Sequence, residues 1–132
     1  MTKLNITAKM PDTIATDRLF LRAPNLGDAE AMQVLANNKT IHKFLARLPY
    51  PFTHEHALDF INNLARWEEE HAYAIINENS DLIGIMGLRA NGNETPELGY
   101  WLGEPFWGKG YATEAVNGVL GAALKSGINK IF

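Results

Sequence analysis

The 132-residue sequence contains no cysteine. Disulfide scaffolds, thiolate metal sites and cysteine nucleophiles are therefore excluded, and the composition is compatible with a reducing compartment. The segment before Pro24 has no apolar stretch of the length that a signal peptide needs, and we see no transmembrane segment. We therefore expect a cytoplasmic protein.

Basic residues are also few, with 12 Lys and Arg against 15 Asp and Glu and a net charge of -3. This balance argues against nucleic acid as the main partner, because phosphate backbones are bound by clustered positive charge. The four histidines lack the spacing of a metal site, so we expect no metal. A chain of this length with 46% hydrophobic residues should bury roughly two-thirds of its unfolded surface, and we expect one domain over residues 1–132.

Apolar periodicity predicts an α/β (α+β) fold with a run of antiparallel strands. Strands are expected at 16–22, 72–76, 82–88 and 97–102, with a turn at 91–93 and a further strand beginning at 128. Helices are expected at 29–37, with Asp28 as N-cap, at 40–47, from Thr53 onward, and at 112–123, with Gly127 as the stop. The aromatic residues Phe52, Phe60 and Trp67 are expected in the core.

The most informative segment is the glycine-containing loop from Gly103 to Thr113, between a predicted strand and a predicted helix. Gly108 and Gly110 lack Cβ atoms, so they can adopt positive φ and allow a ligand to approach the backbone. The first turn of the following helix offers free N–H groups to an anion, so a phosphate or pyrophosphate is the expected ligand. The alternative is a loop whose glycines only shape a tight connection.

Two nucleotide motifs fit this loop poorly. A P-loop needs Ser or Thr directly after Gly108-Lys109 to bind Mg²⁺, and this chain has Gly110 there. The dinucleotide fingerprint needs a third glycine where Thr113 stands. ATP and NAD are therefore disfavoured.

The run Trp107 to Ala115, WGKGYATEA, resembles the pyrophosphate loop of GNAT-superfamily N-acetyltransferases. That loop has Gln or Arg, two residues, Gly, one residue, and Gly or Ala, so Gly110 and Ala112 match. Trp107 stands at the Gln/Arg position, as in the ribosomal-protein N-terminal (RimJ/RimL-like) branch. Residues 16–22 and 97–102 resemble the first and fourth strands of that branch. The resemblance implies a GNAT-like mixed, mostly antiparallel sheet flanked by helices.

The resemblance further implies a transferase that uses acetyl-CoA as cosubstrate and acetylates a primary amine, with a protein N-terminal α-amine as the preferred acceptor. A small-molecule or polyamine acceptor remains open, and the acidic run Glu68 to Glu70, expected at a helix end, would suit it. A non-catalytic CoA-binding or interaction module is the alternative from another class.

Site residues follow from the same resemblance. The coenzyme-binding residues are expected to be Trp101, Leu102, Trp107, Gly108, Lys109, Gly110, Tyr111, Ala112 and Thr113. A backbone N–H near Trp101 or Leu102 would polarise the thioester carbonyl. Glu97 is the expected base, and its alternative is an exposed acid at a strand end. An α-amine with a pKa near ~8 costs only about 1 to 1.5 kcal/mol to deprotonate at pH 7, so a weak base suffices.

The family fold continues through another helix and two strands, which often provide a tyrosine acid for the departing thiolate. This sequence contains no such continuation, so the resemblance implies an incomplete domain whose general acid stays unidentified. We expect self-association through the open sheet edge, or else marginal stability.

Overall fold

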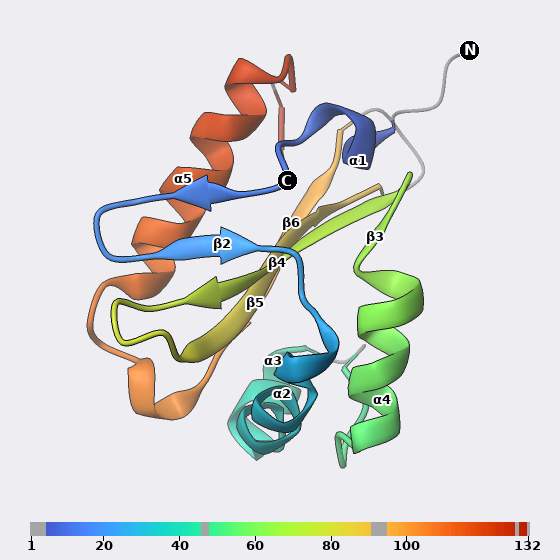
Figure 1. Cartoon of the computed structure of the whole chain (residues 1–132), viewed down its shortest axis with the longest axis vertical. Helices are drawn as coiled ribbons and strands as arrows, with labels where there is room; N and C mark the ends of the chain where they lie inside the picture. Colours follow the sequence, from blue (N-terminus) through green and yellow to red (C-terminus); the bar gives the residue numbers. More distant parts are fainter. Residues whose placement is uncertain (1–4, 46–47, 91–94, 129, 132) are drawn as a thin grey trace.

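The computed structural model describes residues 5–45, 48–90, 95–128 and 130–131, and these form a six-stranded sheet with helices on both faces (Figure 1). The strands are β1 (Ile14–Ala15), β2 (Phe20–Arg22), β3 (Arg66–Trp67), β4 (Glu70–Ile76), β5 (Leu82–Arg89) and β6 (Glu97–Leu102). Their order is β1-β2-β4-β5-β6, with β3 also paired to β4, and each of these pairs is antiparallel. The expected antiparallel meander of three strands is confirmed.

Helices cover both faces of this sheet. They are α1 (Ile6–Lys9), α2 (Ala29–Ala36), α3 (Lys39–Phe44), α4 (His54–Asp59) and α5 (Tyr111–Lys125), with the 3₁₀ turns η1 (Leu26–Asp28) and η3 (Glu104–Phe106) and the π-helical turn η2 (Phe60–Leu64). One core cluster joins the sheet to α1 and α5, and a second joins it to α2, α3 and α4. The predicted class, a mixed fold with a mostly antiparallel sheet flanked by helices, is confirmed.

The central strand β4 shows how the sequence builds these two layers. Tyr73 and Ile75 are fully buried in the cluster with α5, while Ala72 and Ala74 are buried in the cluster with α2 and α4. Successive strand side chains alternate between faces, so large residues face one layer and alanines the other. The alanines leave room for α2 and α4 to approach the sheet.

Helix α5 follows the predicted periodicity closely. Ala115, Val119 and Ala123 are fully buried at a spacing of four residues. The helix ends where Gly127 takes a φ of 87° and the N–H of Ile128 donates to the Ala123 carbonyl at 2.9 Å. Glycine tolerates this left-handed conformation without steric cost, so the predicted stop is confirmed.

The first predicted strand is shorter than its alternating pattern suggested. Only Phe20 to Arg22 pair as β2, and Thr16 to Leu19 form the turn that leads back from β1. The N–H of Thr16 donates to the Leu19 carbonyl at 2.9 Å, and the N–H of Leu19 donates to the Thr16 hydroxyl oxygen at 3.1 Å. Local threonine hydrogen bonds therefore replace the sheet ladder at these residues.

Helix caps also differ from the expectation. Asp28 does not cap α2 with its side chain, because its carboxylate accepts two hydrogen bonds from Arg22, at 2.8 and 2.9 Å, and one from the N–H of Asn25 at 2.8 Å. Thr53 does cap α4 through the N–H of His56 at 3.1 Å. The return bond of this capping box is made by the His56 ring, which accepts from the N–H of Thr53 at 3.0 Å.

Two further expectations were wrong. Trp67 lies in β3 with 43% of its surface exposed, whereas Phe52 is buried as predicted. The acidic run 68–70 lies in the β3–β4 turn and the first position of β4, because the chain leaves its helical conformation at Ala65. The N-terminal segment also contains a helix that the sequence pattern did not predict, α1, whose Ile6 is fully buried in the core.

Two predicted features fall wholly or partly outside the described residues. The turn at 91–93 lies wholly outside them, and the predicted terminal strand lies partly outside them, at Asn129 and Phe132. At the described positions 128, 130 and 131 the chain is not in a strand. Among the described residues, no helix has the length and apolar character needed to cross a membrane.

Candidate functional site

A cleft of about 710 Å³ opens where α3, the end of β6 and the glycine loop meet. Eight of the nine predicted coenzyme-binding residues line it, namely Trp101, Leu102, Trp107, Gly108, Gly110, Tyr111, Ala112 and Thr113. Lys109 is exposed and does not line the cleft. Residues expected from two separate sequence segments thus lie around one cavity.

The glycine loop leads directly into the N-terminus of α5. Gly108 and Gly110 have φ values of 76° and 82°, so the predicted positive φ is found at both glycines. The N–H of Glu114 donates to the Gly110 carbonyl at 3.1 Å and makes the first hydrogen bond within the helix. The N–H groups of Tyr111 to Thr113 therefore precede the helix ladder, at the end where the helix dipole is positive. This end of the cleft is suited to an anion.

Trp107 connects the loop to the edge strand. Its indole N–H donates to the Leu102 carbonyl at 2.7 Å, while 40% of the residue remains exposed. The N–H of Gly103 donates to Ile83 of β5 at 2.8 Å. Backbone groups alternate in direction along an antiparallel strand, so Leu102 directs its N–H and C=O to the edge of β6 that faces away from β5.

An ionic cluster on the other side of the loop was missed by sequence reasoning. Arg18, in the β1–β2 turn, donates from Nη1 to the Lys109 carbonyl at 2.9 Å and from Nε to Glu114 of α5 at 2.7 Å. Its guanidinium carbon lies 4.5 Å from the centre of the Tyr111 ring. The hydrogen bond with Glu114 raises the pKa of Arg18 above its ordinary value. Both segments belong to the quoted motifs, but nothing in the sequence indicated that they touch.

Glu97, the predicted base, lies apart from this cleft. It is the first residue of β6, is exposed, and pairs in register with Arg89 of β5. Leu102 lies five positions further along β6, which corresponds to about 17 Å along the strand. The structure therefore does not bring Glu97 into contact with the glycine loop.

Helix α3 supplies a wall of the cleft that sequence reasoning did not assign to the site. Thr40, Ile41, Phe44 and Leu45 line the cavity, and Phe44 is 76% exposed. The ring of His42 holds this helix in place, because its two nitrogens lie 2.8 and 2.9 Å from the carbonyl oxygens of Ala36 and Leu48. The only sequence signal was the prediction of a short helix at 40–47.

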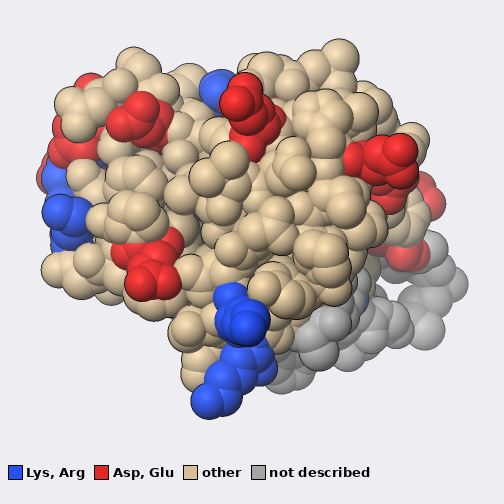
Figure 2. Space-filling model, turned by 90° about the horizontal axis from the view of Figure 1, so that it is seen from below, with Lys and Arg blue, Asp and Glu red and all other residues tan. Residues whose placement is uncertain are grey.

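Charges of both signs are interspersed around the molecule's lower end, which carries α2, α3 and the glycine loop (Figures 1 and 2). Most of the surface visible in Figure 2 belongs to uncharged residues, with Lys, Arg, Asp and Glu as separate groups around it. Among the described residues, no cluster of three or more His, Asp or Glu could hold a metal ion.

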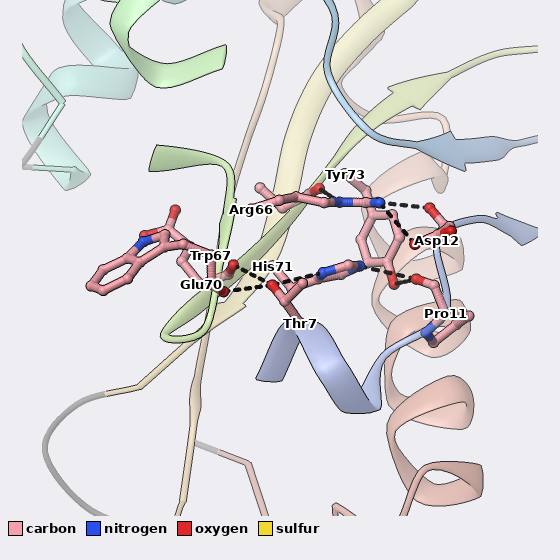
Figure 3. Close-up of polar contacts among 9 residues, drawn as sticks. Thr7, Pro11, Asp12, Arg66, Trp67, Glu70, His71 and Tyr73 are labelled. Carbon is pink, nitrogen blue, oxygen red and sulfur yellow. Dashed lines mark hydrogen bonds and ion pairs between the residues drawn. The ribbon is translucent and has the colours of Figure 1, made fainter. Parts of the chain in front are cut away.

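A second polar cluster connects α1 and the residues after it to β3 and β4 (Figure 3). His71 is fully buried, with Nε2 3.0 Å from the Pro11 carbonyl and Nδ1 3.2 Å from the Thr7 hydroxyl oxygen. The Tyr73 hydroxyl donates to the same Pro11 carbonyl at 2.6 Å, and Arg66 donates to the Asp12 carbonyl at 2.6 Å. These contacts fasten residues 7–12 to the sheet.

Burial controls the protonation of this cluster. Removal from water and, to a lesser extent, the positive charge of Arg66 together lower the pKa of His71 to about 4. Burial likewise raises the pKa of Tyr73 to about 12, against the opposing effect of Arg66. His71 and Tyr73 are therefore neutral at pH 7 and enclosed, which fits an anchoring role and not proton transfer to a substrate.

Comparison with known proteins agrees with this geometry. The family model described as acetyltransferase (GNAT) domain matches residues 18–132. The uncharacterized N-acetyltransferase p20 of Bacillus licheniformis is 29% identical over 126 residues, which cover 91% of this chain and 71% of p20.

Two solved structures share the fold. The microcin C7 self immunity acetyltransferase MccE, in complex with acetyl-CoA and AMP, superposes with a TM-score of 0.68 at 26% identity, over 86% of this chain and 66% of MccE. RimL, a ribosomal L7/L12 alpha-N-protein acetyltransferase in complex with coenzyme A, superposes with a TM-score of 0.71 at 24% identity, over 87% of this chain and 69% of RimL. At this identity, the similarity to RimL shows a shared fold alone. The chain thus spans about two thirds of the length of these structures. With its matched family model covering nearly the whole sequence, the chain belongs to the GNAT family of N-acetyltransferases.

Proposed function

We propose that this chain binds acetyl-CoA in the cleft and transfers its acetyl group to a primary amine. The observation that carries the proposal is the cleft itself, which joins the N-terminus of α5 to the outer edge of β6 in one cavity. A coenzyme with a charged pyrophosphate and a long amide-containing arm needs both features. MccE, with the same fold, holds acetyl-CoA in its structure.

The pyrophosphate would be bound by backbone N–H groups at the glycine loop. Gly108 and Gly110 line the cleft and carry no side chain that would block a phosphate. The N–H groups of Tyr111 to Thr113 add donors at the positive end of the α5 dipole. Lys109 is exposed and does not line the cleft, so we expect its charge to contribute less than the backbone does.

The pantetheine arm would run along the free edge of β6. Amide groups of the arm can pair with strand backbone groups that face away from β5, as an added strand does. Leu102 has such an outward N–H, whereas the N–H of Trp101 is directed to β5 by the alternation of the ladder. Of the two expected donors to the thioester carbonyl, this alternation favours Leu102.

Glu97 is our proposed base. In the transfer, the amine nitrogen attacks the thioester carbon, the carbon–sulfur bond breaks, and the amine releases one proton while the thiolate takes one up. Glu97 and Trp101 have the same strand parity, so both lie on the face of β6 toward α2 and α4. Since Glu97 is exposed and remote from the loop, it would accept the proton through water.

A protein N-terminal α-amine is the acceptor that we propose. The α-amine is much cheaper to deprotonate than a lysine side chain, about 1 to 1.5 against roughly 4.6 kcal/mol at pH 7. Within the described part of the chain, the cleft lining contains no Asp or Glu, and the acidic run 68–70 does not reach it. A polycationic acceptor would therefore find no carboxylate partner in the cleft.

The acceptor is tested by assaying the 132-residue chain with acetyl-CoA and either N-terminally free peptides or spermidine. We expect acetylation of the peptide α-amine at least tenfold above that of spermidine. A reversed preference would overturn the acceptor assignment, and tight acetyl-CoA binding without transfer to either acceptor would favour a non-catalytic CoA-binding module.

We also propose that the chain forms one domain, self-associates and acts in the cytoplasm. β6 ends the strand order of the described sheet, and its outer edge offers unpaired ladder positions to a second copy. Sedimentation at micromolar concentration should show a dimer that dissociates when acetyl-CoA occupies the same edge. A monomer with and without acetyl-CoA would contradict this pairing.

A further inference from the structure

Arg18, in the β1–β2 turn, contacts the glycine loop through its guanidinium group. Arg18 Nη1 donates to the Lys109 carbonyl at 2.9 Å, across 91 residues of sequence. A Cβ added at Gly110 would lie 3.3 Å from Arg18 Nη2, which shows how closely the guanidinium approaches the loop.

Glu114 fixes the position of Arg18. One oxygen of this carboxylate accepts from Arg18 Nε at 2.7 Å, and the other accepts from the Arg18 backbone N–H at 2.8 Å and from the Thr16 hydroxyl. Burial opposes ionisation of Glu114, but the hydrogen bonds from Thr16 and Arg18 outweigh it and hold its pKa below the ordinary value. The carboxylate is therefore charged at neutral pH and accepts hydrogen bonds from both the main chain and the side chain of Arg18.

Tyr111, the first residue of α5, packs its ring against the guanidinium of Arg18. Its ring lies against the guanidinium, 4.5 Å from the central carbon, and the residue is 8% exposed. Its hydroxyl donates at 2.6 Å to Glu78, in the turn between β4 and β5. Arg18 is thus held by α5, by its own turn and by a ring that is itself tied to a third segment.

The contact with Arg18 sets the orientation of the peptide group between Lys109 and Gly110. In a planar trans peptide the C=O of one residue and the N–H of the next point in opposite directions. Because Arg18 holds the Lys109 carbonyl on its own side, the Gly110 N–H is directed away from Arg18. Gly110, which follows this peptide, tolerates φ of either sign, so without the Arg18 contact the peptide could rotate and present its carbonyl oxygen to an anion.

We propose that Arg18 is a positioning residue for the coenzyme pyrophosphate, which fixes the Lys109–Gly110 peptide so that N–H groups and not a carbonyl face the phosphates. This inference rests on the proposed function of the cleft. The positive charge of Arg18 is compensated by Glu114, so its effect is on the direction of a peptide and not on the net charge of the site.

The experiment uses two ligands and the full chain. Acetyl-CoA contains the pyrophosphate, and S-acetylpantetheine contains only the arm and the thioester. In Arg18→Gln we expect acetyl-CoA affinity, measured by calorimetry, to fall at least tenfold, while S-acetylpantetheine affinity, measured by NMR titration, changes less than twofold. Arg18→Lys keeps the charge but loses the planar fork, so it should recover less than half of the lost affinity on a logarithmic scale.

Arg22→Gln is the matched control, because it breaks a similar pair with Asp28, at 2.8 Å, that lies outside the cleft lining. It should leave the ratio of the two affinities unchanged. Acetyl-CoA affinity of Arg18→Gln within twofold of the parent, or an equal loss for both ligands, would overturn the positioning role.

A ligand-free measurement separates this inference from the proposed function. In NMR spectra of the free chain, the amide signals of Gly108 and Gly110 should broaden or double in Arg18→Gln and stay sharp in Arg22→Gln. Unchanged glycine signals would contradict the inference even if acetyl-CoA binds. A parent chain that fails to bind acetyl-CoA, with doubled glycine signals in Arg18→Gln, would instead refute the proposed function and leave the peptide-fixing contact established.

Discussion

The indole N–H of Trp107 donates a 2.7 Å hydrogen bond to the backbone carbonyl of Leu102, and this contact joins the glycine loop to the end of β6. Replacement by phenylalanine removes the donor and keeps an aromatic ring. Trp107 is 40% exposed, so water can satisfy the freed carbonyl and the stability cost should stay below about 1 kcal/mol. We expect acetyl-CoA affinity to fall several-fold by calorimetry with little change in melting temperature. A large loss of stability with intact affinity would show that the bond serves the fold alone.

A second prediction compares Gly110, the N-cap of α5, with Gly121 inside the same helix. Gly110→Ala places a side chain at a φ of 82°, which costs roughly 1 to 2 kcal/mol, and brings a Cβ to 3.3 Å from Arg18. We expect lower stability and weaker acetyl-CoA binding, and Gly110→Val should abolish binding. Gly121→Ala is the control, because its Cβ meets no atom within 4 Å and it lies inside α5, where alanine should add about 0.5 to 1 kcal/mol. Equal effects of the two alanines would refute the conformational argument.

Lys109→Ala gives the complementary result. The lysine side chain is exposed and outside the cleft lining, so its removal should weaken acetyl-CoA binding only modestly, by about threefold or less. The measurement is calorimetry at two salt concentrations. A loss as large as that of Gly110→Val would mean that side-chain charge, and not backbone donors, holds the pyrophosphate.

Glu97→Gln keeps the shape of the side chain and removes the proton acceptor. Acetyl-CoA affinity should survive and turnover with an amine should fall at least tenfold, with the largest loss at low pH, where the amine is mostly protonated. Glu30→Gln, an exposed acid in the first turn of α2, is the control. Turnover that matches the parent across pH would make Glu97 an ordinary strand-end acid.

The buried His71 predicts a specific pH dependence of stability. Its folded pKa is lowered to about 4, below the unfolded value of 6.5, so the unfolded chain binds a proton first as the pH falls. The stabilisation by neutral His71 is complete above pH 6.5 and is lost between pH 6.5 and 4, by up to about 3 kcal/mol. Denaturant unfolding should follow this slope.

The exposed His54 provides the control for that experiment. His54→Asn should leave the slope unchanged, whereas His71→Asn should flatten it while lowering stability at every pH. If His71→Asn fails to fold, NMR titration of the parent gives the same information. A His71 that titrates near 6.5 in the folded chain would contradict the prediction.

Much of the framework could be predicted because it depends on local pattern. The alternation that places Tyr73 and Ala74 on opposite faces, and the fourfold spacing of Ala115 and Val119, are direct consequences of strand and helix geometry. The positive φ of Gly108 and Gly110 could be expected because glycine has no Cβ atom that would clash in this conformation. These features need no knowledge of the rest of the fold.

The parts that could not be predicted depend on contacts between distant segments. Arg18 and Glu114 are 96 residues apart, and an alternating pattern around Arg18 indicated a strand where a turn forms. Ile6 lies in a segment where the sequence pattern predicts no helix, yet it is fully buried in α1, which the contacts of His71 with Thr7 and Pro11 hold on the sheet. The α3 wall of the cleft was missed because exposed residues such as Phe44 follow no periodic signal.

An NMR titration of the 132-residue chain with acetyl-CoA tests whether the coenzyme binds in the cleft between the glycine loop and β6. We expect the largest amide shift changes on Gly108 to Thr113 and on Tyr100 to Leu102, with saturation at one equivalent. Amide changes confined to other segments, or no change at millimolar acetyl-CoA, would contradict this expectation.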